Sequence, residues 1–176
     1  AKSIQRALAV KDGPIVPLIA ETGGLNAMIV DSSALLEQVV DDVISSAFGS
    51  AGQRCSALRV VYVQNEIADD FIELLAGAMK ELRVGDPMFL SSDIGPVIDE
   101  DALSRLHQHE EFLEEHGSFI AHVPIQPDRL NRRFYFAPVA FEIADISLLE
   151  GEVFGPVLHV IRYRGEQAAI MVRFIN

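Results

Sequence analysis

Three side chains of this 176-residue chain have types and surroundings suited to chemistry: Cys55, Glu21 and Glu152. Cys55 is the single cysteine, so no second thiol of the chain can join it in a disulfide or a metal cage. It is therefore either a small buried hydrophobe or a reactive thiol. The two carboxylates lie where hydrophobic residues meet glycine, within residues 15–24 and 152–156. Such places are typical of strand ends and tight turns that face a cleft.

Several of these positions also have an interpretation without chemistry. Glu21 could be a strand-end carboxylate that accepts backbone N–H groups, and Phe154 could be an ordinary packing residue of the core. Arg54 could be a counter-ion for a substrate carboxylate, but an arginine in a tight loop more often braces the backbone. The three histidines within residues 107–116 predict no metal site, because residues i and i+2 of a helix point to different faces and glutamates surround them.

Composition excludes some classes of partner. The formal net charge is −12 and the pI is near 4.7, so we expect no contact with nucleic acid or an anionic membrane. No apolar run approaches the roughly 18 residues that a membrane span needs. One cysteine without a disulfide framework favours a reducing compartment, and we expect the cytoplasm. Hydrophobic residues make up 49% of the chain, which predicts apolar surface buried in a homo-oligomer or against further parts of the protein.

Hydrophobic periodicity predicts strands that alternate with helices. We expect helices over residues 1–10, 35–48, 67–82, 99–116 and 166–174, and strands over residues 15–20, 26–30, 58–63, 119–123, 133–143 and 157–163. Strands alternating with helices of a dozen or more residues indicate βαβ units and a largely parallel sheet. Cys55 then lies in the glycine-rich loop between a buried helix and an apolar strand.

Three segments resemble the catalytic-domain signatures of the NAD(P)-dependent aldehyde dehydrogenase superfamily, in this order and at these separations. They are residues 21–24 (ETGG), 52–55 (GQRC) and 152–156 (EVFGP). Residues 19–24, 46–58 and 82–98 resemble in particular the proline-catabolic branch, the L-glutamate γ-semialdehyde (1-pyrroline-5-carboxylate) dehydrogenases. That branch includes the dehydrogenase modules of bifunctional bacterial proline utilization proteins. The resemblance runs nearly end to end, although this chain would form well under half of a family member.

The resemblance implies an α/β fold, a three-layer αβα catalytic domain with a largely parallel sheet. Residues 21–176 would be an incomplete, cysteine-bearing catalytic domain. Residues 1–20 would be the last helix and strand of the Rossmann-like NAD-binding domain. Gly23 and Gly24 are too few for a dinucleotide-binding glycine fingerprint, so the cofactor's phosphate site is expected elsewhere in that domain. We therefore expect this piece to be inactive when isolated.

Family membership would also imply roles for single residues. Cys55 would be the nucleophile, and its backbone N–H would give half of the oxyanion hole. Glu21 would be the general base that activates water. Glu152 would hydrogen-bond the nicotinamide ribose, Phe154 would pack beside the nicotinamide, and Ser56 would bind the substrate carboxylate. The cofactor would be NAD, with FAD only if a proline dehydrogenase domain stands in the same chain.

The implied reaction is the oxidation of L-glutamate 5-semialdehyde to L-glutamate, the second step of proline catabolism. Three alternatives stay open. One is another aldehyde dehydrogenase, for instance one for succinic semialdehyde. Another is an acylating dehydrogenase that passes the thioester to coenzyme A, but those enzymes lack the general-base glutamate and this chain has Glu21. The last is a non-catalytic structural or oligomerisation module that keeps the motifs.

Overall fold

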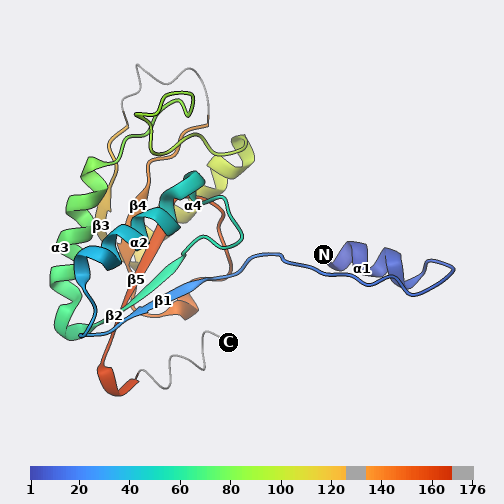
Figure 1. Cartoon of the computed structure of the whole chain (residues 1–176), viewed down its shortest axis with the longest axis horizontal. Helices are drawn as coiled ribbons and strands as arrows, with labels where there is room; N and C mark the ends of the chain where they lie inside the picture. Colours follow the sequence, from blue (N-terminus) through green and yellow to red (C-terminus); the bar gives the residue numbers. More distant parts are fainter. Residues whose placement is uncertain (126–133, 168–176) are drawn as a thin grey trace.

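A five-stranded sheet forms the centre of the protein, which we describe from a computed structural model over residues 1–125 and 134–167 (Figure 1). The strand order is β1-β2-β5-β4-β3. The bounds are β1 Ala27–Val30, β2 Val60–Gln64, β3 Ser118–His122, β4 Val139–Glu142 and β5 Val157–Tyr163. All neighbours pair in parallel except β3 and β4, which are antiparallel. The predicted α/β fold with a largely parallel sheet is therefore confirmed.

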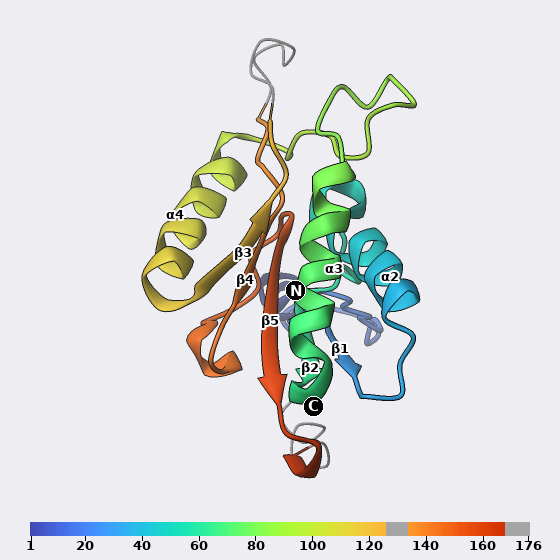
Figure 2. The ribbon, with the colours of Figure 1, turned by 90° about the vertical axis from the view of Figure 1, so that its left-hand side faces the viewer.

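Helices cover both faces of the sheet. Figure 2 shows α2 (Leu36–Phe48) and α3 (Asn65–Glu81) on one face and α4 (Glu100–His116) on the other. Parallel strands need this double cover, because both of their faces carry apolar side chains. β2 is accordingly buried from Val60 to Val63. Each helix turns an apolar stripe to the sheet, for example Phe71, Leu75 and Met79 of α3.

The amino-terminal segment departs from the prediction. Helix α1 (Lys2–Ala9) forms as expected, but none of its residues is buried. Residues 15–20 are no strand, and Ile15 and Ile19 are 99% and 85% exposed. An apolar run becomes a strand only where a neighbouring strand satisfies its backbone groups, and no described segment pairs with this one. Figure 1 shows α1 and the following residues reaching away from the sheet.

The other boundaries agree to within a few residues, with two exceptions. The strand predicted over 133–143 begins only at Val139, directly after Pro138, which has no N–H to donate to a ladder. Of the helix predicted over 166–174, the described residues include only the start of the segment, where Gly165–Gln167 forms a short 3-10 turn; residues 168–174 lie outside them. No helix among the described residues is long and apolar enough to cross a membrane.

Candidate active site

The three motifs converge because each stands directly before one of three adjacent parallel strands. Residues 21–24 precede β1, residues 52–55 precede β2, and residues 152–156 precede β5. The order β1-β2-β5 makes these strands neighbours. Since parallel strands have their amino ends on one edge of a sheet, the three loops meet there. This edge is opposite to the carboxyl edge at which open α/β sheets usually bind ligands.

The loop that carries Cys55 begins with a left-handed turn. After α2 ends at Phe48, Ser50 and Ala51 have φ of 57° and 54°, and Gly52 has φ of +64°. Side-chain-bearing residues rarely adopt this conformation, which costs about 1–2 kcal/mol for each of them. The chain then turns so that Cys55 lies exposed at the surface. The hypothesis that Cys55 is a buried hydrophobe is therefore wrong.

Gly52 lets this loop touch the third motif. A Cβ at Gly52 would collide with the carbonyl of Gly155 and lie 3.0 Å from the carbonyl oxygen of Ala47. Gly155 is equally constrained, because a Cβ there would lie 2.9 Å from Cγ of Leu106 in α4. Gly52 is thus needed for the nucleophile's loop to pack against the backbone of Gly155, and Gly155 is needed for its own segment to pack against Leu106.

Arg59 is the buried charged group of the site, with 1% of its surface exposed. Its Nε and Nη2 donate to Glu152 Oε1 at 3.2 and 3.1 Å, and its Nη1 donates to the Gly155 carbonyl at 3.0 Å. Nη2 also donates to the Arg54 carbonyl at 3.4 Å, and the guanidinium carbon lies 5.1 Å from the centre of the Phe154 ring. Burial lowers the pKa of Arg59, while the hydrogen bond and charge of Glu152 raise it.

The first motif and the residues just after it reach the same cluster through Gly23 and Asn26. Gly23 (φ +93°) packs closely against Glu152. A Cβ at position 23 would collide with the second carboxylate oxygen, Oε2, of Glu152. Asn26 donates from Nδ2 to the carbonyls of Cys55 and Ala57, at 2.8 and 2.9 Å. The side chain of Asn26 therefore fixes the backbone on both sides of Ser56.

Two histidines hold the backbone of Arg59: His159 contacts it directly and His109 contacts His159. His159 Nδ1 lies 2.8 Å from the Arg59 carbonyl, which can only accept, so Nδ1 carries the hydrogen. Burial lowers the pKa of His159 to about 4, and this ring is neutral at pH 7. Its Nε2 is then an acceptor, and His109 Nε2 donates to it at 2.9 Å. Burial also lowers the pKa of His109.

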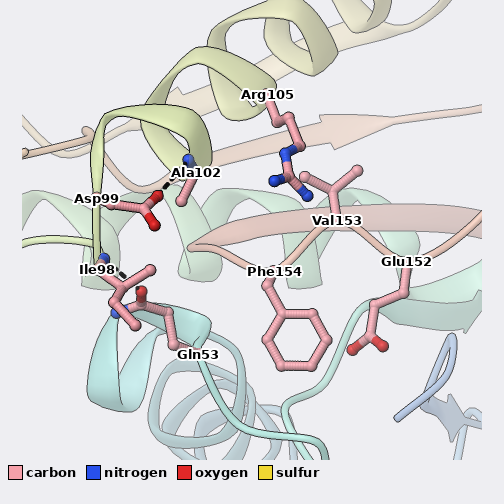
Figure 3. A pocket seen from close by; sticks show the side chains of 8 residues that line it. All are labelled: Gln53, Ile98, Asp99, Ala102, Arg105, Glu152, Val153 and Phe154. Carbon is pink, nitrogen blue, oxygen red and sulfur yellow. Dashed lines mark hydrogen bonds between the residues drawn. The ribbon is translucent and has the colours of Figure 1, made fainter. Parts of the chain in front are cut away.

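A pocket of about 390 Å³ opens beside the third motif (Figure 3). The Phe154 ring, 41% exposed, stands between Gln53 and Glu152, and Arg105 of α4 faces Val153. Gln53 accepts from the Ile98 N–H at 2.8 Å and donates to the Pro96 carbonyl at 3.3 Å. The pocket is lined by Gln53, Ile98, Asp99, Ala102, Arg105, Glu152, Val153 and Phe154.

The structure brings most of the predicted site residues together, but not all. Cys55 and Ser56 lie exposed on one loop, and Glu152 and Phe154 line the pocket beside it. Glu21 is exposed, and no hydrogen bond joins it to Cys55 among the described residues. Among the described residues, the segment that carries Glu21 is joined to the site by Gly23, which contacts Glu152, and by Asn26, which donates to the Cys55 and Ala57 carbonyls. No group of three or more metal-binding side chains occurs in the described part of the chain.

Sequence reasoning missed Arg59, His159, Asn26 and Gln53. A signal existed for two of them: Arg59 and His159 are polar residues inside apolar runs, at residues 57–63 and 157–161. A buried polar residue in a strand requires a partner. No such signal marks Asn26 or Gln53, because their hydrogen bonds are made to backbone groups of distant loops.

Known proteins resemble this chain over its whole length. A model of the aldehyde dehydrogenase family matches residues 1–173. Bifunctional protein PutA of Escherichia coli is 48% identical over 183 residues, which are 100% of this chain and 14% of that protein. A malonate-semialdehyde dehydrogenase of Listeria monocytogenes is 38% identical over 155 residues, 87% of this chain and 32% of that protein. A crystal structure of mutant Bradyrhizobium japonicum proline utilization A aligns with a TM-score of 0.91 and 50% identity, covering 99% of this chain and 17% of that one.

These comparisons confirm the resemblance that the three motifs predicted, both to the aldehyde dehydrogenases and to the bifunctional proline utilization proteins. The chain spans about 14% of the length of the PutA relative from Escherichia coli. Within that share, the fold agrees with that of the Bradyrhizobium japonicum structure over 99% of this chain. The chain belongs to the aldehyde dehydrogenase family.

Proposed function

We propose that this chain is part of a longer protein that oxidises L-glutamate γ-semialdehyde to L-glutamate with NAD. One observation carries the proposal: an exposed thiol, Cys55, stands where three family motifs meet at one edge of the sheet. The similarity to bifunctional PutA supports the substrate. Residues 1–20 then belong to the end of the NAD-binding domain, and residues 21–176 to an incomplete catalytic domain.

Cys55 is the nucleophile in this proposal. Its thiolate adds to the aldehyde carbon, and the carbonyl oxygen becomes the anion of a thiohemiacetal. Among the described residues, no acceptor takes the Cys55 backbone N–H, so this N–H is free to donate to that anion. The addition is required because an aldehyde carbon releases hydride readily only once it is tetrahedral. Loss of hydride leaves a thioester on Cys55.

The residues of the pocket fit the nicotinamide end of NAD. Phe154 offers a half-exposed ring face, and Glu152 offers a carboxylate whose position is fixed by Arg59. Because Gly23 has no side chain, nothing at position 23 crowds the second carboxylate oxygen of Glu152. Glu152 would hold the nicotinamide ribose and Phe154 would pack beside the ring. When bound, NAD supplies the hydride acceptor.

Glu21 and Ser56 complete the proposed reaction. Glu21 takes a proton from water, the resulting hydroxide attacks the thioester carbonyl, and the Cys55 thiolate leaves as L-glutamate forms. The Glu21 carboxylate is exposed and has no hydrogen-bond partner among the described residues, so it is accessible to the attacking water. Ser56 donates a hydrogen bond to the α-carboxylate of the substrate, and Asn26 fixes the backbone on either side of it.

Partners follow from the same assignment. The remaining parts of the NAD-binding and catalytic domains lie elsewhere in the longer protein. FAD would be a second cofactor only if a proline dehydrogenase domain stands in the same chain, an arrangement favoured by the similarity to a protein named bifunctional. We expect a homo-oligomer in the cytoplasm. Oxidation of malonate semialdehyde is the second candidate, supported by the 38% identity to the Listeria monocytogenes dehydrogenase.

Replacement of Cys55 tests the proposal in the full-length protein. Cys55→Ala should lower the rate of NADH formation from glutamate γ-semialdehyde by roughly a thousandfold or more, because no other described group can form the thioester. Ser33→Ala, an exposed side chain next to β1, is the control that should keep normal activity. Near-normal oxidation by Cys55→Ala would overturn the mechanism. Faster turnover of malonate semialdehyde by the wild type would favour the second candidate.

A further inference from the structure

We propose that Arg59 is a positioning residue, which holds Glu152 and Phe154 in place against the loop that carries Cys55. The inference rests on the proposed roles of Glu152 and Phe154 toward NAD. Arg59 touches neither thiol nor pocket opening and is 1% exposed. It acts on the cofactor only through the residues that it holds.

Its contacts reach both loops at once. One guanidinium donates to the Glu152 carboxylate and the Gly155 carbonyl, both in the third motif, and to the carbonyl of Arg54, directly before the nucleophile. The Phe154 ring lies 5.1 Å from its central carbon, within the distance at which a cation and a ring attract each other. A change in the Arg59 side chain therefore alters Glu152, Phe154 and the Cys55 loop together.

The backbone of Arg59 is fixed as firmly as its side chain. Its N–H donates to the Asn26 carbonyl at 3.0 Å, and its carbonyl accepts from His159 N at 3.0 Å and Nδ1 at 2.8 Å. Asn26 in turn holds the Cys55 carbonyl, and His109 holds His159. The guanidinium is thus attached to a fixed backbone, which orients it to make its four hydrogen bonds to Glu152, Gly155 and Arg54.

Only arginine satisfies this geometry. Its planar fork directs donors to three acceptors at once, whereas a lysine ammonium is a single point of charge on a flexible stem. A buried ion pair is seldom favourable for stability by itself, since both charges lose their water. Retention of a charge at a 1% exposed position is thus better explained by the orientation that it gives to Glu152, whose side chain is 11% exposed.

Arg162 provides the matched control. It is also an ion-paired arginine of the sheet, with Asp69 at 2.7 Å and Glu142 at 2.8 Å. It lies near the carboxyl end of β5, whereas the motifs meet at the amino ends of the strands. Its loss removes arginine–carboxylate ion pairs without touching the site, although the Arg162 side chain is 32% exposed against 1% for Arg59.

The test compares Arg59→Met, Arg59→Lys and Arg162→Met in the full-length protein. The first measurement is the Kd of NAD by calorimetry without aldehyde; the second is the rate at which iodoacetamide alkylates the peptide that contains Cys55. Loss of a charge-assisted contact typically weakens binding by about ten- to a hundredfold, and we expect this for Arg59→Met. Arg59→Lys should lie between it and the wild type. Arg162→Met should leave the Kd of NAD and the alkylation rate within about twofold of wild type.

A double variant shows whether Arg59 works through Glu152. If it does, Arg59→Met should weaken NAD binding by a clearly smaller factor in the Glu152→Gln background than in the wild type, because the Glu152 contact is already lost and only the hold on Phe154 remains. The proposal would be overturned if the increases in the Kd of NAD caused by the two single substitutions multiply fully in the double variant. It would also be overturned if Arg59→Met leaves the Kd of NAD unchanged. If Arg59→Met fails to fold, the Kd of NAD is compared instead for Arg59→Lys and for the double variant. The double variant leaves no unpaired buried carboxylate. If the wild type binds NAD but does not oxidise glutamate γ-semialdehyde, the proposed substrate is wrong. The role of Arg59 can still be tested, because its test measures NAD binding alone.

Discussion

The thiol of Cys55 reaches the surface on a backbone that is costly to form. Ser50 and Ala51 both adopt the left-handed conformation, in which a Cβ crowds the neighbouring backbone. Strain of this kind persists where surrounding contacts over-determine it, and it is concentrated at functional sites. Here the contacts are the packing of Gly52 on Gly155 and the hydrogen bond from Arg59 to the Arg54 carbonyl.

Gly52→Ala tests whether this packing holds the loop. The new Cβ would meet the Gly155 carbonyl at a left-handed φ, so the free energy of unfolding should fall by more than about 1 kcal/mol. Gly77→Ala is the control, because Gly77 lies exposed within α3 with nothing within 4 Å of a new Cβ. It should raise stability by about 1 kcal/mol. Urea unfolding measures both, and equal stability of Gly52→Ala and wild type would contradict the account.

Substrate choice should depend on Ser56. Ser56→Ala in the full-length protein removes the proposed donor to the α-carboxylate, while the bonds of Asn26 to the Cys55 and Ala57 carbonyls remain. A hydrogen bond to a charged group contributes about 1.5–3 kcal/mol, so KM for glutamate γ-semialdehyde should rise about ten- to a hundredfold. KM for an aliphatic aldehyde without a carboxylate should barely change. Equal losses on both aldehydes would mean that Ser56 only supports the loop.

At the scale of elements, the polar residues that support the site are Arg59, directly before β2, and His159, within β5. His159 of β5 is 4% exposed, and burial lowers its pKa from 6.5 to about 4. The folded state therefore stays neutral in a range where the unfolded chain binds a proton. The free energy of unfolding is unaffected above pH 6.5 and falls as the pH drops from 6.5 toward 4.

Urea unfolding of the chain between pH 7 and 4.5 measures this loss, which should approach about 3 kcal/mol at most. His109, whose pKa burial also lowers, acts in the same direction. The carboxyls of Asp31 and Asp145 have lowered pKa values and destabilise only at more acidic pH. His159→Gln should flatten the pH dependence, and replacement of the exposed His122 should not. A wild type as stable at pH 5 as at pH 7 would rule this out.

Local hydrophobic patterns predicted the helices and strands but not which strands pair with each other. Helices α2, α3 and α4 and strands β1, β2 and β5 have long apolar stripes or runs, and each was predicted within a few residues. The neighbours of β2 depend on chain closure over about a hundred residues, as in the pairing of Val60 with His159. Periodicity carries no information on such pairing. The convergence of the motifs at the amino edge was for this reason visible only in the fold.

The motif residues of the candidate site were predicted from the sequence, whereas the residues that hold them in place were not. Cys55, Ser56, Glu152 and Phe154 were assigned from motifs that resemble a family, and they lie together as expected. The roles of Arg59 and its partners depend on contacts between residues up to 100 positions apart, which no short pattern encodes. The strand predicted over residues 15–20 was wrong for a related reason. An apolar run does not reveal which strand, if any, it pairs with.

At the scale of the whole molecule, this chain is a small share of the proteins that it resembles. The chain spans 14% of the Escherichia coli PutA relative and 17% of the Bradyrhizobium japonicum structure. Among the described residues, Glu152 and Phe154 offer contacts for the nicotinamide end of NAD, and no glycine-rich turn before a helix offers a phosphate cradle. The proposed reaction must accordingly be measured on the full-length protein.

The central claim is that Cys55 carries the acyl group. The full-length Glu21→Gln variant should accumulate this intermediate, because water is no longer activated. It should be mixed with glutamate γ-semialdehyde and NAD, quenched in acid within seconds, digested and analysed by mass spectrometry. The account predicts a burst of NADH together with a glutamyl thioester on the peptide that contains Cys55. A burst that leaves Cys55 unmodified, or an acyl group on another residue, would contradict it.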